Sequence, residues 1–185
     1  MRFVLFLLLT AILAPQAIAD VRQCGCDPAR PETLRARECS LCNEADKADA
    51  KADVFFLKDI NPRKPNRWLA LPRAHGAVGH PLHSLPRALQ TKLWQEAIAK
   101  AKELWGPEAW GIAYNGEVHR TQCHGHVHIG KLLQGLAPGK FYEVSSPAEI
   151  RVPPDGTGIW LHPVAGGKKI RVHYGEGITE TALLR

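Results

Sequence analysis

Alternating and helical patterns of hydrophobic residues divide the middle of the chain into strands, a turn and one helix. Val54 to Leu57 is rich in β-branched and aromatic residues and predicts a strand. Asp59 to Asn66 carries two prolines and two asparagines and predicts a turn. Trp68 to Leu71 predicts a second strand, which Pro72 ends. The two strands together predict an antiparallel hairpin.

Hydrophobic residues recur at helical spacing from Ser84 to Trp105, and this stretch predicts the one long helix. Ser84 can cap the first turn, in which Pro86 is well tolerated, and Gly106 follows the last residue. Gly111 to Tyr114 then predicts a third strand. The helix residues expected to face the sheet are Leu89, Leu93, Ala97, Ala101 and Leu104.

Three histidines at alternate positions, His124, His126 and His128, predict a fourth strand. Residues two apart on a strand point to the same side, so the three imidazoles would stand in a row, about 6.5–7 Å apart. On a packed face each imidazole costs desolvation free energy unless it has a partner. Histidine serves as base, nucleophile or metal ligand, so this run is the main candidate for chemistry. A solvated polar face is the alternative.

Beyond Phe141 the hydrophobic pattern becomes shorter. Three stretches, Glu149 to Val152, Gly158 to His162 and Lys169 to Tyr174, alternate and are separated by proline- and glycine-rich turns. They predict a small C-terminal β appendage, in which we expect His162 and His173 to be surface or core residues rather than ligands. The sequence as a whole therefore predicts an α+β fold with an antiparallel sheet, one long helix and this appendage.

The first residues have the pattern of an export signal. Arg2 precedes a short apolar run, and Ala17 to Ala19 has the small residues of a cleavage site. The run from Val4 to Leu13 is too short to span a bilayer. We expect a signal peptide at 1–19, a cysteine-bearing segment at 20–38, the main domain at 39–138 and the β extension at 139–185. The expected location is periplasmic or secreted, with an uncleaved N-terminal anchor as the alternative.

Charge and cysteine content narrow the function classes. The net charge of +6 suits an anionic partner, such as a phosphate ester or an acidic membrane surface. No dense basic run with interleaved aromatic residues is present, so nucleic acid is not an expected partner. Five cysteines leave at least one thiol unpaired if the others form disulfides. Cys39 and Cys42 have the spacing of a zinc-binding pair, with a disulfide as the alternative.

These residues together resemble the histidine triad (HIT) superfamily, whose signature is His-x-His-x-His followed by apolar residues. Asp59 through His75 resembles the strand, turn and strand that end in Pro-basic-x-His, and Asn115 through His128 resembles the asparagine loop and triad. The resemblance covers about residues 39–131. The run that begins at Arg120 is especially similar to exported CDP-diacylglycerol pyrophosphatases, which cleave that liponucleotide to CMP and phosphatidate. The chain is shorter after the triad than expected for those enzymes.

The resemblance implies a role for each residue of the site. His126 would attack the α-phosphorus and form a phosphohistidine, a covalent route that requires no catalytic metal. His128 would donate to a phosphate oxygen, and His124 would complete the triad. The residues implied in binding the nucleotide or liponucleotide are Asp59 at the ribose hydroxyls, Asn115 and Thr121 at the α-phosphate or leaving oxygen, and Gln122 and Arg67 at phosphate.

Two positions depart from the family pattern, and several functions remain open. Many members have histidine at the position of Arg67, and an apolar residue is usual at the position of Gly125. The alternative enzymes are HIT hydrolases of nucleoside phosphoramidates or dinucleoside polyphosphates. A nucleotide-binding module without catalysis and a periplasmic metal-binding protein are the alternatives outside enzymes.

Zinc-bearing HIT proteins are similar to this chain in the place of their ligands. The matching residues here are Cys39, Cys42, His75 and His124, and two cysteines with two histidines suit a closed structural zinc site. Disulfides between Cys39 and Cys42, or from Cys24 or Cys26 to one of them, are the alternative. Cys123 is expected to be a small core residue. HIT proteins are often dimers, so a homodimer is a further expectation.

Overall fold

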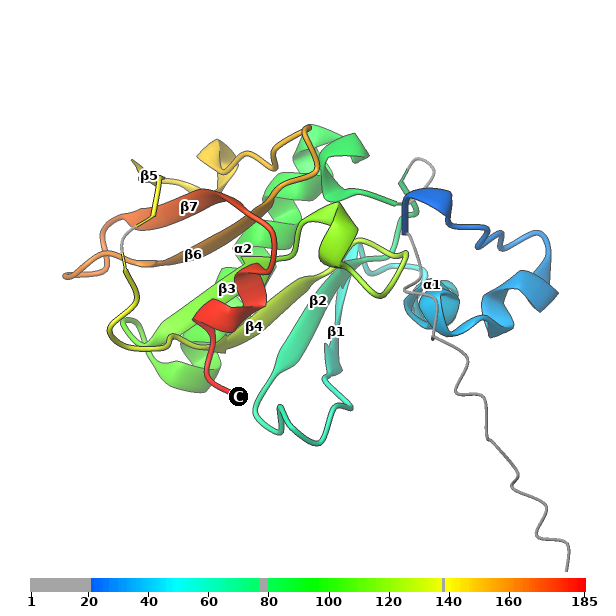
Figure 1. Cartoon of the computed structure of the whole chain (residues 1–185), viewed down its shortest axis with the longest axis horizontal. Coiled ribbons are helices and arrows are strands. Elements are labelled where there is room, and N and C mark those ends of the chain that lie inside the picture. The colour runs from blue at the N-terminus through cyan, green and yellow to red at the C-terminus, as the bar shows by residue number, and fades with distance from the viewer. Residues whose placement is uncertain (1–20, 77–79, 138) are drawn as a thin grey trace, which may run out of the picture.

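The chain folds as an α+β protein around an antiparallel sheet. The structure is a computed structural model and describes residues 21–76, 80–137 and 139–185. Within these ranges a seven-stranded sheet has the order β1-β2-β4-β3-β6-β7-β5 (Figure 1). The expected signal peptide at 1–19 lies outside the described residues. The strands are β1 Val54–Lys58, β2 Trp68–Pro72, β3 Trp110–Tyr114, β4 Val127–Lys131, β5 Phe141–Val144, β6 Gly158–Pro163 and β7 Ile170–Glu176.

The helix α2, Arg87–Trp105, covers one face of this sheet (Figure 1). It begins later than expected because Ser84 belongs to a preceding 3-10 turn, where its hydroxyl donates to the Pro81 carbonyl at 2.8 Å. It ends before Gly106, whose φ of 75° lies in the left-handed region. The buried residues are Gln90, Leu93, Trp94, Ala97, Ile98 and Ala101, so the buried face is rotated toward Trp94 and Ile98 and away from Leu89 and Leu104.

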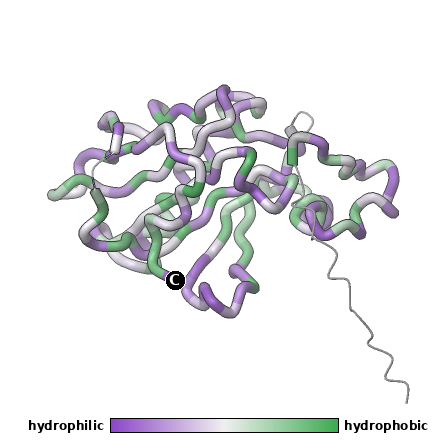
Figure 2. Tube along the Cα trace, viewed as in Figure 1, coloured by the Kyte–Doolittle hydropathy of each residue, from purple (hydrophilic) through white to green (hydrophobic). Residues whose placement is uncertain are grey.

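The predicted hairpin is confirmed in β1 and β2. The two strands pair in antiparallel register, from Val54 opposite Pro72 to Lys58 opposite Trp68. The loop between them is hydrophilic, in contrast to the strands that it joins (Figure 2). Its turn is held by Asp59, whose carboxylate accepts from the backbone N–H of Asn61 at 2.9 Å.

The C-terminal strands extend the same sheet rather than forming a separate appendage. Strand β6 pairs with β3, with Leu161 opposite Ile112 and Ile159 opposite Tyr114. Ile159, Leu161 and Val172 therefore join the core beneath α2. The stretch predicted as a strand at 149–152 instead follows a 3-10 turn, Pro147–Glu149, and is not a strand.

Segments from the two ends of the described chain pack on the sheet face opposite α2, and Figure 1 shows the C-terminal one in front of β3 and β4. The helix α1, Ser40–Lys47, packs there through Leu41 against Leu69 and Leu71. A 3-10 turn at Thr179–Ala182, continued by Leu183, packs against β3 and β6. His128 of β4 lies opposite residues of β2 and β3 on this same face. The two segments therefore frame the end of the histidine run.

Two disulfides hold the N-terminal segment in place. Cys24 pairs with Cys123 and Cys26 pairs with Cys39, while Cys42 is a buried free thiol. Cys123 is fully buried, as expected of a core residue, but it is bonded to Cys24. Cys39 is in a disulfide and so cannot be the zinc ligand that the resemblance implied. Two disulfides indicate a non-reducing environment. Among the helices of the described residues, none is both long and apolar enough to cross a membrane.

Candidate active site

A pocket of about 700 Å³ lies on the sheet face opposite α2. Its apolar wall comes from α1, β1 and β2, its floor from the histidine run, and its far side from the C-terminal segment. Both basic and acidic side chains line it, which suits an anion that also carries polar groups. The lining residues are Arg37, Ser40, Leu41, Glu44, Leu57, Lys58, Asp59, Ile60, Asn61, Lys64, Leu69, Asn115, His119, Arg120, Thr121, Gln122, His126, His128 and Glu180.

The histidine run is only partly a strand. Strand β4 begins at Val127, so His128 lies in the strand while His124 and His126 precede it. The reason is Gly125, where a Cβ atom would lie 2.5 Å from the His80 carbonyl oxygen. The segment that contains His80 thus packs directly on the backbone before β4. The prediction of one regular strand through all three histidines is wrong, and the close approach explains why no apolar side chain stands at Gly125.

His126 is held as a neutral imidazole with one free ring nitrogen. Its Nδ1 lies 2.8 Å from the carbonyl oxygen of His124. A carbonyl can only accept, so Nδ1 carries the proton and Nε2 keeps its lone pair. Burial lowers the pKa of His126 to about 4, because the hydrogen bond to the His124 carbonyl only partly compensates. The side chain lines the pocket, so a nucleophilic nitrogen is available there at neutral pH.

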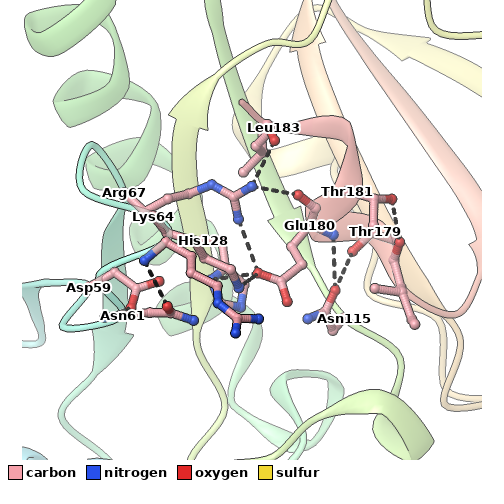
Figure 3. A network of polar contacts seen from close by, with 12 residues as sticks. Asp59, Asn61, Lys64, Arg67, Asn115, His128, Thr179, Glu180, Thr181 and Leu183 are labelled. Carbon is pink, nitrogen blue, oxygen red and sulfur yellow. Dashed lines mark hydrogen bonds and ion pairs between the residues drawn. The ribbon is translucent and has the colours of Figure 1, made fainter. Parts of the chain in front are cut away.

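His128 lies beside His126 but has a different partner. The two ring centroids are 5.0 Å apart at an angle of 71°. Burial and the neighbouring His126 lower the pKa of His128 well below its ordinary value. Its Nδ1 lies 3.7 Å from Oε2 of Glu180, a residue of the C-terminal segment (Figure 3). This carboxylate partner was not expected from the sequence.

The structure brings Asp59, Asn115, Thr121 and Gln122 to the same pocket as His126 and His128, as the sequence predicted. The amide oxygen of Asn115 accepts from the backbone N–H of Glu180 at 3.0 Å, so its NH₂ group remains available. Gln122 is already engaged. Its Oε1 accepts from the Ser40 hydroxyl at 2.8 Å, and its Nε2 donates to the Arg37 carbonyl at 3.1 Å. Gln122 therefore connects the histidine run to the N-terminal segment.

Arg67 lies outside the residues that line this pocket. It is 1% exposed, and its guanidinium donates to the carbonyls of Leu183 at 2.7 Å, Glu180 at 2.8 Å and Leu184 at 3.1 Å. It also pairs with the Glu180 carboxylate at 3.0 Å. Four donors are therefore held by the C-terminal segment, and the geometry supports an anchor for that segment rather than a phosphate contact.

The sequence reasoning missed several charged residues of the pocket, among them Lys64, Arg120 and Glu180. Arg120 is buried and donates to the Cys123 carbonyl at 3.2 Å. Its place four residues before His124 was a usable signal, since a cation beside a histidine run suits an anionic ligand. Lys64 stands in a polar turn and Glu180 in a short C-terminal stretch, and neither position carries a local signal of function.

A second cluster of ligand-type residues lies behind His124. The candidate ligand atoms of Cys42, His75 and His80 are all within 4.8 Å of one another. The ring of His124 lies 5.0 Å from that of His75 and 5.9 Å from that of His80. His80 has a positive φ of 44°, which a non-glycine residue adopts only where its surroundings hold it. The cluster keeps three of the four expected residues, with His80 standing where Cys39 was expected.

The hydrogen bonds of this cluster use one ring nitrogen of His75 and of His124 and leave the other without a partner among the described residues. The Nε2 of His124 donates to the Pro72 carbonyl at 2.7 Å, and that of His75 donates to the Asp46 carboxylate at 2.9 Å. The Nδ1 atoms of His75, His80 and His124 are buried, with no hydrogen-bond partner among the described residues. Burial lowers the pKa of His124 to about 3 and raises the pKa of the Cys42 thiol to about 11. Orphaned nitrogens beside a thiol are a donor set that fits zinc.

His162 and His173 lie away from both clusters. His173 is buried with its ring stacked on Trp160 at 3.6 Å, and the Nε2 atoms of the two histidines are 3.2 Å apart.

What the pocket can do chemically follows from its parts. A neutral imidazole with a free lone pair, a second imidazole beside it, and two cations that line the pocket can attack and bind a phosphoryl group. A comparison with protein-family models finds no matching family, and a search of curated proteins finds no match.

Proposed function

We propose that the protein is a hydrolase of phosphorus-containing anhydrides that acts outside the cytoplasm. It cleaves a nucleotide diphosphate ester through a phosphohistidine on Nε2 of His126. The observation that supports this proposal is the 2.8 Å contact between His126 Nδ1 and the His124 carbonyl, which leaves Nε2 unprotonated at the pocket. The favoured substrate is CDP-diacylglycerol, from the resemblance of the run that begins at Arg120 to exported pyrophosphatases.

The reaction has two displacements at one phosphorus atom. Nε2 of His126 attacks the α-phosphorus, the bond from that phosphorus to the bridging oxygen breaks, and phosphatidate leaves with the bond's electrons. Water then attacks the phosphohistidine, the P–N bond breaks, and CMP is released with the proton balance completed by solvent. The leaving group is a phosphate monoester and so a stable anion. Hence the first step needs no dedicated acid at the leaving oxygen.

Groups around the pocket fit the other parts of such a substrate. The cations of Lys64 and Arg120 stabilise the charge that develops on the transferred phosphoryl oxygens. The NH₂ group of Asn115 donates to the same oxygens, and the carboxylate of Asp59 can accept from ribose hydroxyls. The apolar wall that includes Leu41 gives the remainder of the substrate a hydrophobic surface.

The test is the His126→Ala variant. We expect release of nucleoside monophosphate to fall by about three orders of magnitude or more, because the nucleophile itself is removed. The matched control is His162→Gln, which changes a histidine outside the pocket and should keep wild-type turnover. Products are measured by chromatography, and the adduct on the wild type is measured by intact mass after brief exposure to substrate. Full activity of His126→Ala would refute the mechanism.

A panel of substrates distinguishes between the possible substrate classes. CDP-diacylglycerol in detergent micelles, adenosine phosphoramidate and dinucleoside polyphosphates are compared by kcat/KM with the same preparation. We expect the highest value for CDP-diacylglycerol. A higher value for either of the others would move the proposal to the phosphoramidate or polyphosphate hydrolases that the HIT resemblance also allows.

We also propose one structural zinc ion, held by Cys42, His75 and His80 with Nδ1 of His124 as the fourth ligand. The orphaned ring nitrogens and the free thiol support it, and the Asp46 contact to His75 is the outer carboxylate that commonly orients a ligating histidine. Zinc would cross-link helix α1, the connection after β2 and the segment before β4, and would not act on the substrate. It would also fix the His124 carbonyl that holds His126.

Metal content tests this proposal and its rival. We expect one zinc per chain in protein purified without chelator. Removal of that zinc is expected to lower Tm by on the order of 10 °C. Cys42→Ser and His80→Gln should lose the metal, whereas His162→Gln should keep it. No zinc in the wild type would refute the site. Several exchangeable ions that also depend on His126 and His128 would favour a metal-binding protein instead.

A further inference from the structure

The C-terminal segment Thr179–Leu184 contributes Glu180 to the lining of the pocket and is held there by buried hydrogen bonds. Its anchor is Arg67 of the β1–β2 connection, which donates to three of its carbonyls from a fully buried position. The contact between Arg67 and Leu184 joins residues 117 apart in the chain. A segment fixed so firmly can place a side chain accurately against the histidines.

The side chain that it places is Glu180. Its Oε2 pairs with Arg67 Nη1 at 3.0 Å and with the ammonium of Lys64, and it lies 3.7 Å from Nδ1 of His128 (Figure 3). The carboxylate is 20% exposed and His128 is 10% exposed, so water screens the pair only weakly. Among the described residues, Nδ1 of His128 has no partner at hydrogen-bond distance. Glu180 is therefore the group that acts on that ring nitrogen.

The same segment also sets the orientation of Asn115. The backbone N–H of Glu180 donates to its amide oxygen at 3.0 Å, and the Thr179 hydroxyl lies 3.3 Å from the same oxygen. Because a backbone N–H must donate, the amide oxygen is turned toward the segment and the NH₂ group away from it. One short segment thus orients two groups, Asn115 and His128, toward the place of the phosphate.

We propose that Glu180 is a positioning residue that makes His128 a cationic donor when a phosphate binds. The inference rests on the proposed phosphoryl-transfer function. A carboxylate beside Nδ1 favours a proton on that nitrogen, and a phosphate oxygen beside Nε2 favours a second proton there. His128 is charged between these two anions, and its Nε2–H donates to the phosphate.

The groups that face His128 account for its neutrality without ligand. Burial, the neighbouring His126, Lys64 and Arg67 all disfavour the charged form, and Glu180 alone among these favours it. A bound phosphate adds a second anion beside Glu180, and the two anions together favour the charged form of His128. The switch is local, because the side chains that face His128 are already fixed by the contacts of the C-terminal segment.

The experiment is histidine ring NMR on the full chain with and without CMP. In the wild type, the ¹⁵N shifts of His128 should change from a neutral ring to an imidazolium when CMP is added at neutral pH. In Glu180→Gln, His128 should stay neutral with CMP bound, and kcat/KM should fall about tenfold or more. The matched control is Glu103→Gln, an exposed carboxylate on α2, which should behave as the wild type. Glu180→Asp, which keeps the charge, should restore part of the CMP-dependent change.

The outcomes separate this inference from the proposed function. A neutral His128 in the CMP complex of the wild type overturns the inference, and this reading needs no variant to fold. So does an imidazolium that persists in Glu180→Gln. The protein could form the Glu180-dependent imidazolium and still hydrolyse no substrate of the panel. That result supports the inference and refutes the proposed hydrolase function. Absence of CMP binding to the wild type at millimolar concentration overturns both.

Discussion

The two ends of the histidine run are stabilised in opposite ways. At the His124 end, the neighbouring Cys123 is in a disulfide, and His75 and His80 lie beside a buried free thiol. At the His128 end no covalent link is present among the described residues, and the contacts are between full charges on Glu180, Arg67 and Lys64. His126 lies between them, with its proton held by the His124 backbone. The same residue type therefore serves in three environments, because each end is completed by a different segment of the chain.

The largest expected effect is at the His124 end. Replacing Cys24 and Cys123 by serine opens a disulfide that closes 99 residues, and the entropy of a loop of that length predicts a loss of about 4–5 kcal/mol in the free energy of unfolding. The control is the Cys26 and Cys39 pair, with a separation of 13 residues and a predicted loss of about 3 kcal/mol. Urea unfolding measures both. A greater loss from the short loop would contradict the argument.

A slightly smaller effect is expected at the other end. Arg67→Met should cost about 3–4 kcal/mol, because it leaves a buried carboxylate and several carbonyls without their donor. Arg63→Met, in the same loop but exposed, should cost almost nothing. The double variant Arg67→Met with Glu180→Gln should lose less than the sum of the two single variants, since both charges are gone. Additive losses would show that the two side chains do not act as a pair.

The smallest effect is the part of the acid sensitivity that Glu180 contributes at the charged end. The lowered pKa of His124 makes the other end sensitive to acid as well, so the Glu180 part is isolated by a variant. Burial raises the pKa of Glu180, but His128, Lys64 and Arg67 outweigh it and hold that pKa at about 2, below the ordinary 4.5. A lowered carboxyl pKa stabilises the fold above about pH 4.5, and this contribution is lost as the pH falls toward 2. The amount is about 2 kcal/mol. The free energy of unfolding is measured at pH 7 and at pH 3. The loss between the two should be smaller by this amount in Glu180→Gln than in the wild type.

Local pattern predicted the first three strands and the helix well. Val54 to Leu57 and Trp68 to Leu71 alternate around a proline-rich turn, and their pairing is decided by neighbours in the sequence. The start of the helix was misplaced because the Ser84 hydroxyl is used by a preceding turn. The C-terminal strands alternate as expected, but their partner β3 is distant in sequence, so pattern alone could not join them to the sheet.

Several residues that the resemblance implied for the site do line one pocket. They are His126, His128, Asn115 and Asp59, of which Asp59 is distant in sequence from the others. The irregular backbone at Gly125 was not predictable, because it results from His80, a distant residue packed on that glycine. Cysteine spacing did not reveal the pairing either, since Cys39 is closer in sequence to Cys42 but bonds to Cys26. No local sequence pattern marks Glu180 as a site residue, because its place depends on contacts with Arg67 and Lys64, which are distant in sequence.

The Arg67 anchor also has a consequence for the order in which the chain can fold during synthesis. The guanidinium leaves the ribosome long before the carbonyls of residues 183 and 184, which lie more than a hundred residues later. Until they emerge, the guanidinium remains hydrated and the wall of the pocket near His128 is missing. A nascent chain can therefore contain every histidine of the run and still lack a finished pocket. Completion of the site therefore waits for synthesis of the segment Thr179–Leu184.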